Sequence, residues 1–142
     1  MIPPDVRIVS GKTILWAPWT FTWLAEGVLW QINIPQGFEF DGASVPRILW
    51  TITGLTPHGE LEPAALVHDY LYRYGGVLPT GAFWRSGVEC DHPWTRKECD
   101  KLFARIMRES GVPKWRRRLA YIGVRMGGWR FFKRPPRTSP VV

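Results

Sequence analysis

The residues best suited to chemistry lie in residues 64–72, which read AALVHDYLY. His68 and Asp69 stand side by side after an apolar run, and Tyr72 follows His68 by four positions. An imidazole can act as a general base or a ligand, and a carboxylate can bind a cation or orient the imidazole. The same groups can instead form a satisfied polar network that fixes a helix to its neighbours. We favour this structural interpretation because buried polar groups are usually hydrogen-bonded.

Asp100 and the segment FDGASVPR, residues 40–47, are the candidate partners of the His-Asp pair. If its helix packs antiparallel to the first, Asp100 can hold the tautomer of His68; otherwise it pairs with a cation of its own helix. Asp41 and Ser44 suit a tight turn, and we expect the HDYLY helix to clamp that turn. A nucleophilic Ser44 is disfavoured because the G-x-S-x-G elbow is absent. The predicted structural polar cluster is Asp41, Ser44, His68, Asp69 and Tyr72.

Metal-ligand spacing is weak in this chain. Cys90, His92 and Cys99 lie near one another, but their spacing matches no zinc finger or ribbon. We therefore expect no cofactor for a structural protein. Under a hydrolytic role, with His68, Asp69 and Asp100 as catalytic residues, Asp69 would bind a cation or orient the imidazole.

The elements that must position these residues are strands first and helices later. Period-2 alternation predicts strands within residues 12–16, 20–24 and 28–34. The AEG sequence between the last two favours a hairpin in which Gly27 takes a positive φ. Residues 77–94 read as an irregular excursion.

Three helices are predicted. The first covers residues 62–74, with Pro63 in its first turn and a Gly-Gly pair after its end. Thr95 and Glu98 form a capping box for the second, and a third starts near Pro113. The fold class is therefore α+β, a small N-terminal antiparallel sheet packed by about three helices. We expect one domain over residues 1–130 and a basic, Pro-rich tail over residues 131–142.

Positive charge is concentrated at the C-terminal end. The net charge is +7, and residues 111–142 hold nine Lys or Arg and no Asp or Glu. Such an arm favours an acidic protein, an anionic surface or nucleic acid as partner, without base-specific reading. An apolar stripe recurs along the third helix at Trp115, Leu119, Ile122, Met126 and Trp129. The predicted partner-binding residues are Arg116, Arg117, Arg118, Arg125, Trp129, Arg130, Lys133 and Arg134.

Four ordered motifs resemble a bacteriophage-associated family of unknown function. They are the loop FEFDGASVPRILW, the helix ALVHDYLY, the helix TRKECDKLFARIM and the basic helix RRRLAYIGVRMGGW. The resemblance covers about residues 36–129 and implies a phage or prophage origin. It carries no settled activity.

A more local similarity is to secreted phospholipases, which have His-Asp-x-Cys-Tyr on a helix. His68, Asp69 and Tyr72 match these offsets, while Leu71 stands at the cysteine position. The similarity implies His68 as base, Asp69 on calcium and Asp100 as the carboxylate that orients His68. The sequence has no disulfide framework and no Gly-rich calcium loop before this helix.

Two hypotheses follow. The first is a virion-associated accessory structural protein of the tail, neck or capsid surface. It would dock on other phage structural proteins in a multi-copy assembly through a Trp-rich surface and the basic arm. The alternative is a phage-encoded hydrolase, lipase-like or cell-wall-acting, used at host entry or lysis. We expect synthesis in the host cytoplasm, residence in the virion and no transmembrane segment, because no apolar window approaches 18 residues.

Overall fold

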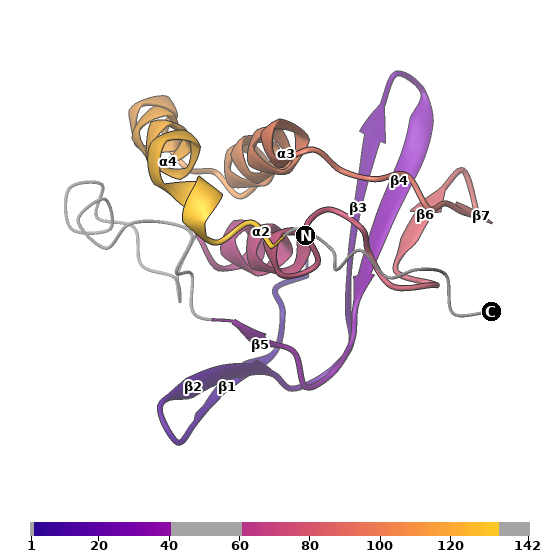
Figure 1. Cartoon of the computed structure of the whole chain (residues 1–142), viewed down its shortest axis with the longest axis horizontal. Helices are drawn as coiled ribbons and strands as arrows, with labels where there is room; N and C mark the ends of the chain where they lie inside the picture. The colour runs from indigo at the N-terminus through magenta and orange to yellow at the C-terminus, as the bar shows by residue number, and fades with distance from the viewer. Residues whose placement is uncertain (1, 41–60, 134–142) are drawn as a thin grey trace.

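The computed structural model of the chain describes residues 2–40 and 61–133. Figure 1 shows the helices gathered on one side, with two separate sheets against them. Most strands are N-terminal and the helices are C-terminal. The α+β class predicted from the sequence is confirmed.

Both sheets are antiparallel. The order is β1-β2-β5 in the three-stranded sheet and β3-β4-β6-β7 in the other. The strands are β1 (Val6–Val9), β2 (Lys12–Leu15), β3 (Trp19–Ala25), β4 (Val28–Ile34), β5 (Glu39–Phe40), β6 (Phe83–Arg85) and β7 (Val88–Glu89). The strands therefore divide between two sheets, where the sequence suggested one.

The β3–β4 hairpin follows the predicted pattern. Trp19, Phe21 and Trp23 are buried and the residues between them are exposed, so β3 has one core face. Ala25 pairs with Val28 across a two-residue turn whose Gly27 has φ +75°. This positive φ matches the right-handed twist of the strands and confirms the predicted turn.

The prediction that residues 77–94 are irregular is wrong in part. Phe83 pairs with Ile32, and the short strand β6 extends the four-stranded sheet beyond β4. A turn at Ser86 and Gly87 then leads into β7. β6 is too short to show an alternation in sequence, and its pairing with β4 stabilises it through tertiary contact.

Three α-helices surround the polar residues of interest: α2 (Glu62–Arg73), α3 (Arg96–Glu109) and α4 (Lys114–Gly127). α2 is the central element, since every residue from Pro63 to Tyr72 is buried. Neighbouring elements on several sides cover it: α3, β4 and β5. Both halves of the predicted capping box at the start of α3 are present, with Glu98 N donating to Thr95 Oγ1.

The α4 helix buries small residues and exposes large ones. Its buried residues are Ala120, Gly123 and Val124. Most of the apolar stripe predicted here faces outward: Trp115, Ile122, Met126 and Trp129 are 51–76% exposed, and Leu119 is partly buried. The short 3-10 turn η1 (Gly128–Arg130) carries the chain on from α4. Among the described helices, none has the length and apolar character needed to cross a bilayer.

Candidate functional site

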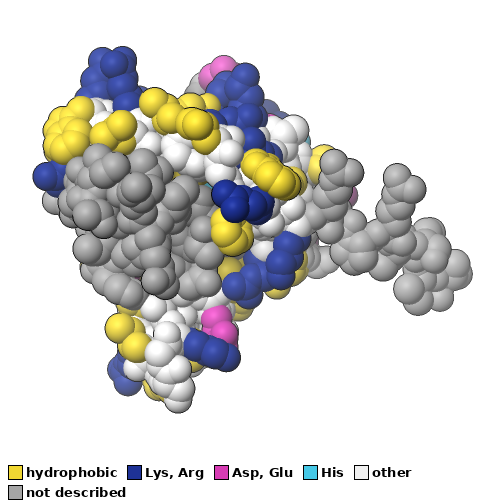
Figure 2. Space-filling view, turned by 60° about the vertical axis from the view of Figure 1, so that its left-hand side comes forward, with side chains coloured by type: hydrophobic (Ala, Val, Ile, Leu, Met, Phe, Trp, Pro, Cys, Tyr) yellow, Lys and Arg dark blue, Asp and Glu magenta, His cyan; other side chains and the backbone are white. Residues whose placement is uncertain are grey.

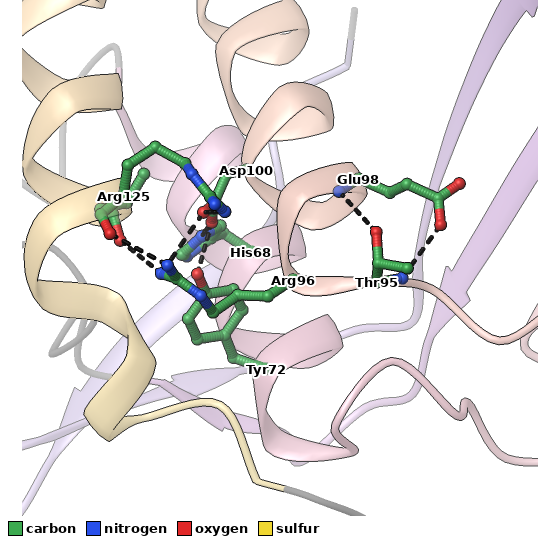
Figure 3. A network of polar contacts seen from close by, with 8 residues as sticks. His68, Tyr72, Thr95, Arg96, Glu98, Asp100 and Arg125 are labelled. Carbon is green, nitrogen blue, oxygen red and sulfur yellow. Dashed lines mark hydrogen bonds and ion pairs between the residues drawn. The ribbon is translucent and has the colours of Figure 1, made fainter.

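A buried polar cluster lies between α2 and α3. His68 and Tyr72 occupy the same face of α2, one turn apart, and both contact Asp100 of α3 (Figure 3). His68 Nε2 lies 2.7 Å from Asp100 Oδ1, and Tyr72 Oη donates to the same oxygen at 2.5 Å. His68 and Asp100 are fully buried. The structure therefore brings His68 and Asp100 together, a contact that the sequence left open.

Two arginines complete the cluster and extend it to α4. Arg125 Nη1 donates to Asp100 Oδ2 at 2.8 Å, and Arg96 Nη1 lies 3.7 Å from the same oxygen. Arg96 also donates to the carbonyl oxygens of Val124 and Arg125, each at 3.0 Å. Carbonyls near a helix C-terminus have few intrahelical donors. The carbonyl of Val124 accepts from the backbone N–H of Gly128 as well as from Arg96, so Arg96 adds a second donor there. We call His68, Tyr72, Arg96, Asp100 and Arg125 the polar cluster.

The charges of the cluster explain two pKa shifts. Burial alone raises the pKa of Asp100, but hydrogen bonds from His68, Tyr72 and Arg125 outweigh it and bring the pKa below its ordinary value. The pKa of Tyr72 is raised, first by burial and then by its hydrogen bond to Asp100. Asp100 is thus held ionised and Tyr72 protonated at neutral pH.

This geometry favours a structural role for the cluster. A general base must come within hydrogen-bond reach of a substrate proton, yet His68 is fully buried. None of the hollows described below is lined by His68, Asp69 or Asp100. The cluster instead cross-links three helices through one carboxylate.

Asp69 does not join His68 in contacting Asp100 within the described residues. It is buried, with 8% of its surface exposed. Asp41 and Ser44 lie outside the described residues, so the clamp on their loop stays a prediction. Residues 2–40 and 61–133 contain no group of three His, Cys, Asp or Glu suited to a metal. Calcium at Asp69 likewise stays a prediction.

The predicted partner-binding residues separate into two kinds. Arg118, Trp129, Arg130 and Lys133 are exposed, whereas Arg116 and Arg117 are partly buried. Arg125 belongs to the polar cluster through its bond to Asp100. Arg134 lies outside the described residues. In the view of Figure 2, hydrophobic side chains and Lys or Arg side chains lie beside one another on the upper part of the molecular surface.

Sequence reasoning missed two features that could bind a partner or a ligand. One is a hollow of about 540 Å³ whose lining includes Trp23, Trp30 and Trp94. A second hollow of about 490 Å³, with Tyr121 and Ile122 in its lining, adjoins it. The nine Trp residues were the available signal. The sequence did not show which of them meet, because Trp94 reaches β3 and β4 only through the fold.

Comparison with known proteins places this chain in a family. The family described as "Protein of unknown function (DUF1353)" matches residues 16–124. The chain belongs to the DUF1353 family. The matched range includes His68, Tyr72, Arg96 and Asp100 and ends one residue before Arg125. The predicted membership of a family of unknown function is therefore confirmed, and its phage association stays a prediction.

One relative is similar to this chain over part of a much longer protein. The "Uncharacterized protein y4jT" of Sinorhizobium fredii (strain NBRC 101917 / NGR234) is 29% identical over 99 residues. The alignment covers 70% of the present chain and 24% of that protein. The chain thus spans about a quarter of the length of this relative. No solved structure matches the chain.

Proposed function

We propose that this DUF1353 chain is an accessory structural protein of a phage particle. In this role it docks on other particle proteins through the outward face of α4. The ordered motifs that resemble a phage-associated family support the setting. The comparisons themselves give a family of unknown function.

The observation that carries the proposal is the row of large apolar side chains exposed on the outward side of α4 and of the turn η1 that follows it. A helix on a globular surface usually turns its large apolar side chains inward. Here Met126 is 76% exposed and Trp129 64%, while the buried residues of α4 are small. Apolar groups rimmed by polar groups are typical of interaction sites. Arg118 and Arg130 on the same surface would select an acidic partner.

Quantitative mass spectrometry of purified phage particles tests this proposal. We expect the protein at a stoichiometry that matches a ring or lattice of the particle. Phage carrying Ile122→Ser and Met126→Ser should lose the protein from particles, because both side chains belong to the exposed stripe. Ile8→Ser is the matched control, since Ile8 is 66% exposed on β1, in the three-stranded sheet and outside α4. Absence of the wild-type protein from particles would contradict the proposal.

A phage-encoded hydrolase, lipase-like or cell-wall-acting, is the second candidate function. One observation favours it: His68 and Tyr72 meet Asp100, as the similarity to secreted phospholipases implies for an orienting carboxylate. Calcium at Asp69 belongs to this candidate. The complete burial of His68 argues against it, because a substrate must reach the imidazole.

Assays on purified protein separate the two functions. A lipase would release fatty acid from phosphatidylglycerol vesicles in the presence of calcium, and Asp69→Asn would abolish this release. The structural role instead predicts no release, together with a large loss of stability in His68→Ala. The enzyme would be favoured by two results together. The wild type would release fatty acid, and His68→Ala would melt at the same temperature as the wild type.

A further inference from the structure

Two adjoining hollows form a continuous groove across one side of the molecule. The first lies between the β3–β4 hairpin and α3, and Trp23, Trp30 and Leu102 are among its lining residues. The second lies between α3 and α4. Lys101, Ala104 and Arg117 line both, so the hollows adjoin along α3. We call this the aromatic-basic groove.

The groove carries a large surplus of positive charge. Six cations line it: Lys101, Arg105, Arg108, Lys114, Arg117 and Arg118. Glu98 is the one acid in its lining, and Glu98 is already engaged by Thr95 and by His92 at 3.3 Å. Its carboxylate offsets one positive charge, and Glu109, which pairs with Arg105 at 3.3 Å, offsets another, so a surplus of positive charge remains in the groove. An occupant with several negative charges would be attracted along the length of the groove.

Packed indole rings line the aromatic end of the groove. The rings of Trp23 and Trp30 stack with centroids 6.0 Å apart, and Trp94 packs against both. Trp94 is fixed through its backbone, which bonds the carbonyl of Gly76 at 2.8 Å. A Trp-lined hollow of about 540 Å³ has room for one large apolar side chain.

Two indole donors in this region have no acceptor. Nε1 of Trp30 and Nε1 of Trp94 are buried, and neither has a hydrogen-bond partner within the described part of the chain. Buried indole N–H groups usually find a partner. The backbone carbonyl or carboxylate of an occupant would supply acceptors at this end once the side chains adjust.

We propose that the aromatic-basic groove binds an acidic peptide segment of a partner protein, with one aromatic side chain anchored among Trp23, Trp30 and Trp94. The Asp and Glu side chains of that segment pair with the cations on α3 and α4. The site is separate from the outward docking surface of α4 except at Arg118 and Ile122, which belong to both. The inference shares with the proposed function the premise that the partner is a protein.

Single-stranded nucleic acid fits the charge of the groove but not its aromatic end. Bases bind such proteins by stacking on exposed ring faces. Here Trp23 is 7% exposed and Trp94 8%, and their rings pack against one another. Trp30 is partly exposed, but the Arg85 guanidinium lies over its ring at 4.8 Å. An anchor side chain can enter the hollow between them and α3, whereas a stacked series of bases finds no platform.

Fluorescence anisotropy with a labelled synthetic peptide tests the inference. The probe has one Trp flanked on both sides by Asp and Glu, and the reference peptide has Ala in place of that Trp. We expect the reference peptide to bind about tenfold more weakly. Lys101→Glu combined with Arg118→Glu should weaken the Trp peptide by about tenfold or more, since both side chains are exposed in the groove.

Arg7→Glu is the matched control, because Arg7 is an exposed cation on β1 outside the groove. It should leave binding within about twofold, the effect of net charge alone. In a 15N NMR spectrum the indole N–H signals of Trp30 and Trp94, assigned with Trp30→Phe and Trp94→Phe, should shift on peptide addition. Equal binding of both peptides, or equal effects of Arg7→Glu and of Lys101→Glu combined with Arg118→Glu, would overturn the inference. So would tighter binding of oligothymidylate that the same groove variants abolish.

The particle assay separates this inference from the proposed function. If Ile122→Ser with Met126→Ser removes the protein from particles and the peptide does not bind, docking stands and the groove inference fails. If the peptide binds as expected but the wild-type protein is absent from particles, the groove inference stands and the virion role fails.

Discussion

At the scale of residues, Asp100 explains most of the buried polar chemistry. A carboxylate removed from water is costly unless charges and donors compensate it. Asp100 is fully buried, and its two oxygens contact His68, Tyr72 and Arg125. One residue thereby satisfies polar groups from two other helices, and removing its charge would leave them without a common acceptor.

Replacing Asp100 by Asn should destabilise the protein strongly. The amide keeps the shape but loses the charge that holds Arg125 and the short bond to Tyr72, so we expect a loss of about 3 kcal/mol in the free energy of unfolding. Urea denaturation followed by circular dichroism measures this loss. Asp91→Asn is the control, because Asp91 is exposed and should change stability by less than about 0.5 kcal/mol. Equal stability of the two variants would show that the cluster contributes nothing net.

The same carboxylate predicts how stability depends on pH. Because the pKa of Asp100 is lower in the folded than in the unfolded protein, the unfolded state binds more protons near pH ~4. The stabilisation is complete above the unfolded pKa and is lost as pH falls through the folded pKa. Melting temperature should therefore drop steeply below about pH 4 in the wild type and more gently in Asp100→Asn. Parallel acid profiles for the two proteins would contradict this assignment.

At the scale of elements, the approach of α2 to the segment before α3 depends on Gly76. Gly76 has φ +82°, and a Cβ at this position would lie 1.8 Å from the carbonyl oxygen of Trp94. The backbone of Trp94 in turn bonds Gly76 at 2.8 Å. The loop after α2 and the start of α3 are thus held together by backbone contact that only glycine permits.

Gly76→Ala should cost more stability than Gly11→Ala. Both positions have a positive φ, so each variant pays about 1 kcal/mol for the left-handed conformation. A Cβ at Gly11 meets nothing within 4 Å, whereas at Gly76 it collides with backbone. We expect about 2 kcal/mol of additional loss for Gly76→Ala from this overpacking. Thermal unfolding of both variants checks the difference, and equal values would mean that the loop relaxes freely.

Elements with local signals were predictable from sequence, and those made by tertiary contact were not. The capping box of Thr95 and Glu98 and the turn at Gly27 use neighbouring residues, so their patterns appear in the chain itself. Asp100 was a candidate partner of His68, but the choice depended on helix packing. The inward bond of Arg125 was not foreseen, because its cationic neighbours in sequence suggested an outward role.

At the scale of the whole molecule, α4 is attached by a narrow apolar face of small side chains and by polar contacts near its C-terminal end. The inner face of α4 contributes small residues, while Arg96 and Asp100 of α3 bind the end of α4. Elements with little apolar burial open more easily than the core. This attachment leaves the large apolar side chains of α4 outside, where the docking proposal needs them.

Hydrogen exchange can show whether α4 is a separately opening unit. In Arg96→Gln the shorter neutral side chain loses the bonds to the carbonyls of Val124 and Arg125. We expect amide protection in α4 to fall about tenfold, with little change in the β3–β4 hairpin. Arg108→Gln is the control, because Arg108 is an exposed cation on the same helix as Arg96. If protection fell equally in α4 and in the hairpin, α4 would open only with the whole domain. A selective fall in α4 would mean that the contacts of Arg96 set the rigidity of the proposed docking face.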